Sequence, residues 1–546
     1  MKSLLTEPTR CLLVRPEFLE NTFYNLSNVF RLLGARSAAP PLGLLTVAAL
    51  LPSAWELKFV DGDTEPVTDA HLEWAQVLFI SGKGPQEQPI RRLIARARAR
   101  GVTVVVGGAG PTLQPDMYAG LADYVVAGEA ENVLPRLLAD MAKGVSAGVY
   151  RGVDPVELSD APLPRYDLVD FDRYLFVGMN YTRGCPFSCE FCAQIEIFGR
   201  KPRTKPTEKI IREHQALYDL GYRGMIDFGY DNLIGNVAHT EEVLTAMLEW
   251  NDAHGYPFCY STEATMNLAR LPRILELMRD NDFRYVFMGI ESGEEAVLDR
   301  TKKGQNTAMP AAEAVRILNS YGLIVNTGLI LGFDGESHGS GARMLDMVQK
   351  SGAFPSLVLP LHALPNTQLS RRLAREGRLF GGGIPVHDED RTDTATTGLN
   401  FVTERPRTEI LEDLARVLEQ LYDPDNHYAR TKLIARQLKP NHRHRPGAVK
   451  TLQLARTFVR IARTIGLEPS TRRHFWTALA RTLLTNPQAV EMVVGQAVFQ
   501  SNYALQAQSY VRALREQIAD VHRVGEAAYN AARLTPRGAV QDSAGS

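Results

Sequence analysis

Three of the five cysteines in this chain of 546 residues lie within eight positions, at Cys185, Cys189 and Cys192. Their spacing, C-x3-C-x2-C, gathers soft thiolate ligands of the kind that bind metals. The alternatives are chance and a structural zinc site. Such a zinc site needs four ligands, yet the next cysteine is Cys259 and the nearest histidine is His214, neither at the spacing of a zinc knuckle. A disulfide would leave one thiol unpaired. Three thiolates can instead hold three irons of a cubane 4Fe–4S cluster and leave the fourth iron open.

Phe191 stands directly before the last cysteine, and this loop resembles the cluster loop of the radical S-adenosylmethionine (SAM) superfamily. The resemblance implies that the three cysteines bind a 4Fe–4S cluster whose open iron is chelated by the amino and carboxylate groups of SAM. In that superfamily, one electron from the cluster cleaves SAM to methionine and a 5'-deoxyadenosyl radical. It further implies that Phe191 is a cofactor contact and that an external electron donor of flavodoxin or ferredoxin type is needed.

The composition, 45% hydrophobic and 23% charged, is that of an ordinary globular protein, and the length predicts about two to four domains. The formal net charge is −1, so global electrostatics point to no particular partner, and we expect no nucleic acid among the partners. The longest apolar run, Leu42–Leu51, is roughly half as long as a transmembrane helix, and the N-terminus lacks the apolar core of a signal peptide. We therefore expect a cytoplasmic, reducing location, with the isolated Cys11 and Cys259 as small core residues.

Short runs of Val, Leu and Ile alternate with helical or loop segments in residues 1–150. Five runs are typical of strands: Cys11–Val14, Leu57–Val60, Val77–Ser81, Thr103–Gly107 and Tyr124–Ala127. With intervening helices such as Gln86–Arg100, they predict an α/β fold with a doubly wound, Rossmann-like parallel sheet. Ligands of such sheets bind beyond the carboxyl ends of the strands.

The carboxyl ends of these predicted strands carry glycines, whose missing side chains allow a ligand to approach the backbone closely. The residues concerned are Ser81, Gly82, Gly107, Gly108, Gly128 and Glu129. Each glycine alone is equally compatible with an ordinary turn. Together with Pro40-Pro41-Leu-Gly43 and the cysteines downstream, they resemble the cobalamin-binding domain fused to many radical SAM enzymes. The resemblance implies that residues 1–150 bind a corrinoid rather than a dinucleotide.

Many cobalamin domains carry D-x-H-x-x-G after the first strand, with a histidine that binds cobalt from below. After Val14 this chain reads Arg15-Pro-Glu-Phe-Leu, without that histidine. The nearest match, Asp69–Trp74 (DAHLEW), lacks the glycine and follows the second strand, so we interpret His71 as a residue at the start of a helix. If cobalamin binds here, its lower face is expected to be water-ligated or vacant.

Beyond a linker rich in Pro and Asp (residues 151–172), a second series of strands and helices extends over residues 173–400. The predicted strands are Phe176–Tyr181, Met225–Phe228, Phe258–Glu263, Tyr285–Glu291, Ile324–Gly332 and Leu357–Leu361. The helices between them are Pro206–Leu220, Glu241–His254, Leu271–Asp280, Pro310–Tyr321 and Gly339–Lys350. This alternation predicts a partial (β/α)6 barrel, in agreement with the barrel of the radical SAM superfamily.

Chemistry in such barrels is placed at the carboxyl ends of the strands, where several residues resemble SAM contacts of the superfamily. Glu291, at the end of the fourth strand, is expected to bind the ribose. Asp231 follows the second strand, roughly where relatives hold the methionyl amine, and Glu263 ends the third, where it could bind ribose or carboxylate. Gly328 and Ile330 belong to a G-x-I-x-G element that packs under adenine. Each acidic residue could equally cap a helix or stabilise a loop.

From Pro406 onward the pattern is helical and poor in Gly, which predicts a helical domain over residues 401–534, followed by a disordered tail at 535–546. Between Arg430 and Arg481 there are 13 Lys or Arg residues and a single acid, Glu468. The tract Ala489–Phe499 is expected to be a buried helix or part of a cover over the substrate.

One helix of the basic segment is amphipathic. Its apolar stripe comprises Leu454, Phe458, Ile461 and Ile465, and the residues offset toward the other side are Arg456, Arg460 and Arg463. A basic amphipathic helix can make peripheral contact with an anionic membrane or bind another anionic partner. More often it packs on its own domain.

The whole arrangement, with Phe198-Gly-Arg-Lys-Pro-Arg203 after the cysteines and a helical tail, resembles cobalamin-binding radical SAM proteins with a C-terminal domain of unknown function. That group includes relatives of hopanoid C-2 methylases. The resemblance implies three cofactors, a 4Fe–4S cluster, SAM and cobalamin. It also implies a small-molecule substrate, lipidic or a natural-product intermediate.

We therefore predict a cobalamin-dependent C-methyltransferase that acts on an unactivated sp3 carbon. Such a carbon offers neither an acidic proton nor a lone pair, so general base catalysis cannot activate it. A 5'-deoxyadenosyl radical can abstract its hydrogen, and the methyl group then comes from methylcobalamin. Two alternatives are a relative that cyclises, contracts or rearranges a ring without methyl transfer, and a non-enzymatic corrinoid or iron–sulfur sensor.

Overall fold

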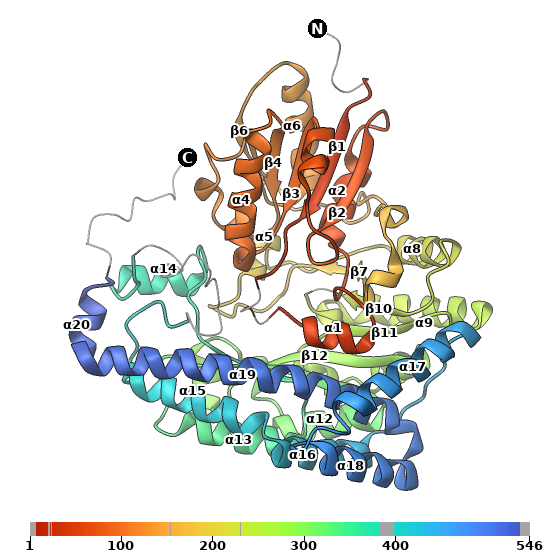
Figure 1. The fold of residues 1–546 in the computed structure, drawn as a ribbon, viewed down its shortest axis with the longest axis vertical. Coiled ribbons are helices and arrows are strands. Elements are labelled where there is room, and N and C mark those ends of the chain that lie inside the picture. The colour runs from red at the N-terminus through yellow and green to blue at the C-terminus, as the bar shows by residue number, and fades with distance from the viewer. Residues whose placement is uncertain are drawn as a thin grey trace. The chain divides into compact units, whose positions relative to one another are not determined.

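The computed structural model describes residues 7–19, 22, 24–152, 154–229, 231–381 and 398–534, and Figure 1 shows the fold with its elements labelled. The described residues form two compact units. The first contains residues 7–186 and 193–250, and the second contains residues 187–192, 251–381 and 398–534. The tail 535–546, for which the sequence predicts disorder, lies outside the described residues.

A parallel sheet of six strands lies in the first unit, in the order β2-β1-β3-β4-β5-β6 (Figure 1). Its strands are β1 (Arg10–Arg15), β2 (Glu56–Asp61), β3 (Val77–Ser81), β4 (Thr103–Gly107), β5 (Tyr124–Ala127) and β6 (Gly148–Arg151). The five predicted strands are confirmed. The sequence did not predict β6, because Tyr150 is the one buried residue in this edge strand and no hydrophobic run marks it.

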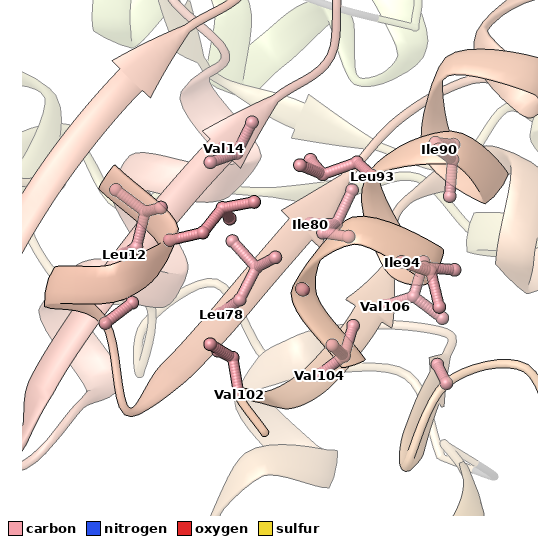
Figure 2. Close-up of a cluster of buried hydrophobic side chains, with 14 of the residues drawn as sticks. Leu12, Val14, Leu78, Ile80, Ile90, Leu93, Ile94, Val102, Val104 and Val106 are labelled. Carbon is pink, nitrogen blue, oxygen red and sulfur yellow. The ribbon is translucent and has the colours of Figure 1, made fainter. Parts of the chain in front are cut away.

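Alternate strand residues point to opposite faces of this sheet. On one face, Leu12 of β1 and Leu78 of β3 pack with Ile90 and Leu93 of the helix α4 (Glu87–Arg98), in the buried cluster of Figure 2. This aliphatic cluster covers one side of the strands. It supplies half of the hydrophobic core of the sheet.

The opposite face of the sheet is covered by two further helices. Cys11 and Leu13 of β1 belong to a second buried cluster with Leu44 of α2 (Leu42–Leu50) and with residues of α6 (Ala130–Ala142). The apolar run of the sequence is therefore a core helix. Helices on both faces confirm the doubly wound, Rossmann-like sheet.

Cys11 and Cys259 are both buried free thiols. Burial raises the pKa of each thiol, that of Cys259 to about 12. Neither is therefore ionised near neutral pH. Both are core residues, as the sequence predicts.

The first unit also contains the start of the second series of strands and helices. β7 (Phe176–Asn180) pairs in parallel with β10 (Met225–Gly229). The helices α8 (Thr207–Asp219) and α9 (Val237–His254) precede and follow β10. A short antiparallel pair, β8 (Thr182–Arg183) and β9 (Arg203–Thr204), flanks the cysteine segment in the sequence.

The second unit continues this alternation. Neighbouring parallel strands follow in the order β11 (Cys259–Glu263), β12 (Phe283–Glu291), β13 (Ile324–Leu331) and β14 (Ser356–Pro360). The helices between them include α10 (Pro272–Asp280), α12 (Ala311–Ser320) and α13 (Ser340–Ser351). The predicted sequence of strands and helices is confirmed.

Helices make up the rest of the second unit. After α14 (Gln368–Arg375) they are α15 (Arg407–Leu421), α16 (Pro424–Gln437), α17 (Ala448–Thr464), α18 (Arg472–Thr485), α19 (Val490–Val524) and α20 (Glu526–Ala531). The tract Ala489–Phe499 opens α19, and its Val493 and Ala497 are fully buried, so it is a buried helix. In the described part of the chain, no helix combines the length and the apolar composition needed to cross a membrane.

Leu12→Ala should destabilise the first unit, because Leu12 is completely buried in the cluster of Figure 2. Removing a buried leucine side chain costs about 2–5 kcal/mol of the free energy of unfolding. Urea unfolding of the full chain measures the loss in the free energy of unfolding. Limited proteolysis, scored by cleavage within residues 1–150, shows whether the loss lies in the first unit. Leu121→Ala is the matched control, since Leu121 is 37% exposed and its loss should stay within about 0.5 kcal/mol. Equal losses in the two variants would contradict the core assignment.

Candidate active site

The ends of β3 and β4 pack on each other through glycine backbone. Gly108 has a φ of +99°, and a Cβ atom there would lie 2.7 Å from the carbonyl oxygen of Gly82 and 2.8 Å from Oγ of Ser81. The amide of Gly82 donates to the carbonyl of Gly107 at 3.2 Å. Because no side chain fits between them, glycine is required at Gly108 for the two strand ends to pack together. In sheets of this kind, ligands bind beyond these carboxyl ends of the strands.

The end of β5 carries Gly128, with a φ of +106°. Its amide donates to Oγ1 of Thr112 at 3.0 Å. The three predicted glycine positions thus lie at the carboxyl ends of neighbouring strands, β3, β4 and β5. The structure brings them to one edge of the sheet, and their contact with cobalamin stays a prediction.

Glu129, the next residue, uses its carboxylate inside the protein. Its oxygens accept from Arg183 Nη1 at 2.6 Å, from Arg203 Nη1 at 2.8 Å and from the amide of Val156 at 3.0 Å. Arg183 also pairs with Glu131 at 2.7 Å. Burial would lower the pKa of Arg183, but the two carboxylates outweigh burial and the pKa is raised. The network therefore joins the carboxyl end of β5 to β8, the strand that precedes Cys185. A role of the Glu129 side chain in binding cobalamin stays a prediction.

His71 is held at the start of a helix, as the sequence predicts. It is the third residue of α3 (Asp69–Trp74), and Thr68 is the N-cap. The His71 amide donates to Oγ1 of Thr68, and Nδ1 of His71 accepts from the Thr68 amide, both at 3.3 Å. This is a capping box in which the imidazole satisfies the backbone.

The backbone before Cys185 is fixed by a close approach that needs glycine. Gly184 has a φ of +88°, and a Cβ there would lie 2.7 Å from the carbonyl oxygen of Lys201. Its amide donates to Asp231 Oδ2 at 2.6 Å, and Asp231 Oδ1 accepts from Gln194 Nε2 at 2.9 Å. Asp231 thus positions the loop that leads into the cysteines. Burial raises the pKa of Asp231 to about 6, and its role as a SAM contact stays a prediction.

Cys189 and Cys192 lie in the second unit, and neither forms a disulfide. The amide of Cys192 donates to the carbonyl of Cys189 at 3.1 Å, which closes a tight turn. Nε2 of Gln305 donates to Cys189 Sγ at 3.6 Å. The ring centroid of Phe191, between the two cysteines, lies 5.4 Å from that of Phe333. This turn thus has a fixed conformation with one hydrogen-bonded thiol.

Glu291 ends β12 in a strained conformation that its neighbours hold. Its φ is +66°, in the left-handed region that a non-glycine residue rarely adopts. Its buried carboxylate pairs with Lys303 Nζ at 2.6 Å. Asn306 Nδ2 donates to the carbonyls of Gly289 at 2.8 Å and Ile290 at 3.0 Å. Strain that is held in place at a strand end is typical of a functional site.

Lys303 connects this strand end with the cysteines of the second unit. Its burial lowers the pKa, but the negative charges of Glu291 and of Cys189 outweigh burial, and the pKa of Lys303 is raised. Its Nζ also lies 5.8 Å from the ring centroid of Phe191. A positive charge therefore stands beside two predicted thiolate ligands and the predicted ribose ligand.

One face of the strands β11 to β13 is half-buried, whereas the alternate residues are buried beneath helices. Glu263 pairs in register with Phe287, and Gly289 with Gly328. Ile330 lies two residues beyond Gly328 on the same face. The structure thus places Glu263, Gly328 and Ile330 on one face of neighbouring strands. This supports a fit to SAM, and the individual contacts stay predictions.

The sequence did not predict Lys303, Gln305 and Asn306 as residues of the site. They lie in a turn between α11 (Glu295–Arg300) and α12, and the run Lys302–Asn306 (KKGQN) was the one available signal. Asn326 was also missed. It is a polar residue at an inward position of β13, and its Oδ1 is buried without a hydrogen-bond partner among the described residues.

Among the described residues, no three His, Cys, Asp or Glu side chains converge on a position that could hold a metal ion. Each thiolate of a cubane cluster binds its own iron. A cluster site therefore needs no such convergence. Cys185, Cys189 and Cys192 form no disulfide, and their thiols are of the ligand type that such a cluster takes.

Three family models match successive parts of the chain. A model described as a B12 binding domain matches residues 31–138, and the radical SAM superfamily model matches residues 179–348. A domain of unknown function (DUF4070) matches residues 367–516. The matches thus follow the first sheet, the cysteine motif with its strands, and the helices of the second unit.

Two relatives and one solved structure extend these matches. An uncharacterized methyltransferase of Synechocystis is 36% identical over 520 residues, 94% of this chain and 94% of that protein. The hopanoid C-2 methylase of Rhodopseudomonas palustris is 36% identical over 357 residues, 64% of this chain and 66% of that protein. The cobalamin-dependent SAM radical enzyme OxsB has a TM-score of 0.58 at 14% identity and covers 95% of this chain and 81% of that chain. At this low identity, the likeness to OxsB shows a shared fold and nothing more.

The pKa of Asp231 leads to a pH dependence of stability. The carboxyl titrates near pH 6 when folded and near 3.8 when unfolded, so the folded state binds more protons between these values. The contribution of Asp231 to stability must therefore fall as the pH rises through this window. Asp231→Asn removes the titrating group, so the melting temperature of the wild type should fall relative to that of Asp231→Asn as the pH rises.

Differential scanning fluorimetry of the metal-free protein between about pH 4 and pH 6 measures this difference. Asp219→Asn, which changes an exposed carboxylate on α8, is the control and should follow the wild type. Parallel curves for the wild type and Asp231→Asn would contradict the raised pKa.

Proposed function

The chain belongs to the cobalamin-binding radical SAM proteins, and on this premise we propose that it is a C-methyltransferase acting on an unactivated carbon of a polycyclic lipid. The observation that carries the proposal is its likeness, over nearly the whole chain, to a protein named as a methyltransferase. Proteins of this family use a 4Fe–4S cluster, SAM, cobalamin and an electron donor. The likeness to a hopanoid C-2 methylase supports the lipid substrate, which would place the protein at a membrane surface.

When bound, the cluster and SAM supply a radical that abstracts hydrogen, and cobalamin supplies the methyl group. The chain itself must hold these groups, orient the substrate and exclude water. We assign Cys185, Cys189 and Cys192 as the cluster ligands, because their spacing fits three irons and none of them is in a disulfide. The hydrogen bond from Gln305 to Cys189 would stabilise negative charge on that sulfur.

We propose that the carboxylate of Glu291 binds the ribose of SAM. The ion pair with Lys303 fixes the carboxylate at the end of β12, as an acceptor for a ribose hydroxyl requires. Gly289 and Gly328 are paired in register on the half-buried face of the strands, and the Glu291 carboxylate and Lys303 Nζ occupy the space beside Gly289. We propose, from the resemblance of the Gly328–Gly332 segment to the adenine-packing element of the superfamily, that adenine packs near Gly328 and Ile330. Asp231 holds the Gly184 amide, so we expect it to act on SAM through the loop that it positions.

Glu291→Ala should weaken SAM binding by roughly ten- to a hundredfold, because a hydrogen bond to a buried carboxylate contributes about 1.5–3 kcal/mol. Anaerobic equilibrium dialysis of the reconstituted protein measures this change. Glu294→Ala is the matched control, since its carboxylate pairs with Ser337 and Arg343 and should not affect SAM.

Glu291→Gln tests the same assignment without removing the side chain. It keeps an acceptor oxygen but loses the charge that pairs with Lys303. We expect an affinity between those of the wild type and Glu291→Ala. Wild-type affinity in Glu291→Ala, with its iron content intact, would exclude Glu291 as a SAM ligand.

The overall reaction should be a methylation that consumes two SAM molecules per product. One SAM is cleaved to methionine and 5'-deoxyadenosine, and the other donates its methyl group and leaves as S-adenosylhomocysteine. The two nucleosides should therefore form in equal amounts after uncoupled cleavage is subtracted. Anaerobic turnover with methyl-deuterated SAM and a panel of polycyclic lipids, followed by mass spectrometry, measures nucleosides and label together.

Cys192→Ala is the control for this reaction and should lose 5'-deoxyadenosine and product together. Product that forms with 5'-deoxyadenosine but without S-adenosylhomocysteine or label would move the protein to the cyclising or rearranging class. A reconstituted protein that turns over no SAM with any substrate would favour a sensor.

A further inference from the structure

The helix α17 (Ala448–Thr464) leaves most of its apolar surface uncovered. Five large apolar side chains are between 36% and 76% exposed: Val449, Leu452, Leu454, Phe458 and Val459. Within the helix only Ile461 is buried, and Ile465, just beyond its end, is buried as well. A surface helix normally buries its apolar stripe in its own domain. Here the domain covers one edge of the stripe and leaves the rest exposed.

The exposed apolar residues of α17 lie next to cations. At about 100° per residue, Val459 and Leu452 lie roughly 160–180° around the helix from the buried Ile461, and Phe458 lies between them and Ile461, about 60° from the latter. Arg463 and Arg456 follow directly beyond Leu452 on the same turn of the helical wheel. The free face of α17 is therefore apolar in the middle and basic at its edge.

The next helix along the chain, α18 (Arg472–Thr485, labelled in Figure 1), also exposes apolar side chains. It buries one face, formed by Phe475, Ala478, Leu479 and Thr482. Outside that face it exposes Trp476 and Leu483 at the flank and Leu484 on the opposite side, the last to 87%, and the connecting loop exposes Leu467 to 67%. The indole of Trp476 donates to the carbonyl of Gly466 at 2.9 Å, which holds the ring where the two helices meet.

The charge around these helices has one sign. From Leu438 to Ala489 the single acid is Glu468, in a chain whose formal net charge is −1. Arg456, Arg463, Arg472 and Arg473 are exposed, and none of them is in an ion pair with another described residue. Positive charge is therefore concentrated around exposed Leu, Val, Phe and Trp side chains. A binding partner that matches both properties carries negative charge and can also take up apolar groups.

We propose that this α17–α18 surface docks peripherally on an anionic lipid bilayer, with its apolar side chains in the boundary between headgroups and acyl chains. Trp, Leu and Arg on one amphipathic surface suit that boundary, where rings and aliphatic groups enter the lipid and guanidinium groups stay with phosphates. Nucleic acid would satisfy the arginines but would leave Leu484, Leu467 and Val449 in water. The inference stands on this surface and does not depend on the substrate being a lipid.

Co-sedimentation of the full-length protein with vesicles tests the proposal. The vesicles contain phosphatidylcholine alone or a mixture with phosphatidylglycerol. We expect binding to the mixed vesicles, weakened by salt, and little binding to phosphatidylcholine alone. A charge variant (Arg456→Gln, Arg463→Gln, Arg472→Gln, Arg473→Gln) and an apolar variant (Leu467→Gln, Leu483→Gln, Leu484→Gln) should each weaken binding on the order of tenfold or more.

The matched control carries Leu121→Gln, Leu163→Gln and Leu220→Gln, three exposed leucines of the first unit, and should bind like the wild type. Brominated lipid should quench tryptophan fluorescence in the wild type and much less in Trp476→Phe, a readout that does not depend on the multiple variants folding. Wild-type binding by both docking variants would overturn the proposal. So would binding to an oligonucleotide without binding to vesicles, or self-association that the apolar variant abolishes.

Discussion

A buried carboxylate shared by two arginines is the interaction on which the first unit depends. Glu129 accepts from Arg183 and Arg203, and all three side chains lie in the interior. None of these charges could be buried alone, because breaking such a pair costs about 3–5 kcal/mol. The pairing therefore fixes the glycine-lined end of β5 to β8 and β9, the two strands that flank the cysteine segment in the sequence. In the first unit, a predicted cobalamin edge and the approach to a predicted cluster ligand are held by one carboxylate.

In the second unit, a buried ion pair likewise fixes the end of β12. A left-handed Glu291 costs on the order of 1–3 kcal/mol, and its ion pair with Lys303 and the two hydrogen bonds from Asn306 offset that strain. The carboxylate is thereby held before any ligand arrives. Because this side chain is already ordered, binding a ligand to it costs less conformational entropy. We therefore relate the strained backbone of Glu291 to its proposed role in binding a ligand rather than to the packing of the sheet.

The sequence predicted the strands β3, β4 and β5 to the residue, because each is an apolar run that begins and ends at polar or turn residues. It predicted the three cysteines from their spacing and Glu291 from its place at a strand end. It could not predict that Lys303 pairs with Glu291, since that contact depends on how a turn folds back onto β12. Likewise, Glu129 reads as a residue of a glycine-rich strand end, and only the tertiary structure reveals its two arginine partners.

The basic helix shows a different limit of sequence analysis. Periodicity predicts which side chains share a face of a helix, but it cannot predict whether another element covers that face. In α17 the predicted stripe is divided, since Ile461 and Ile465 are buried and Leu454 and Phe458 are exposed. Packing on its own domain explains the first pair. The second pair leaves apolar surface in water, which costs about 25 cal/mol per Å2, and the field of the neighbouring arginines keeps other cationic surfaces away. A structure that retains both features on one helix is suited to an anionic surface that can also take up apolar side chains.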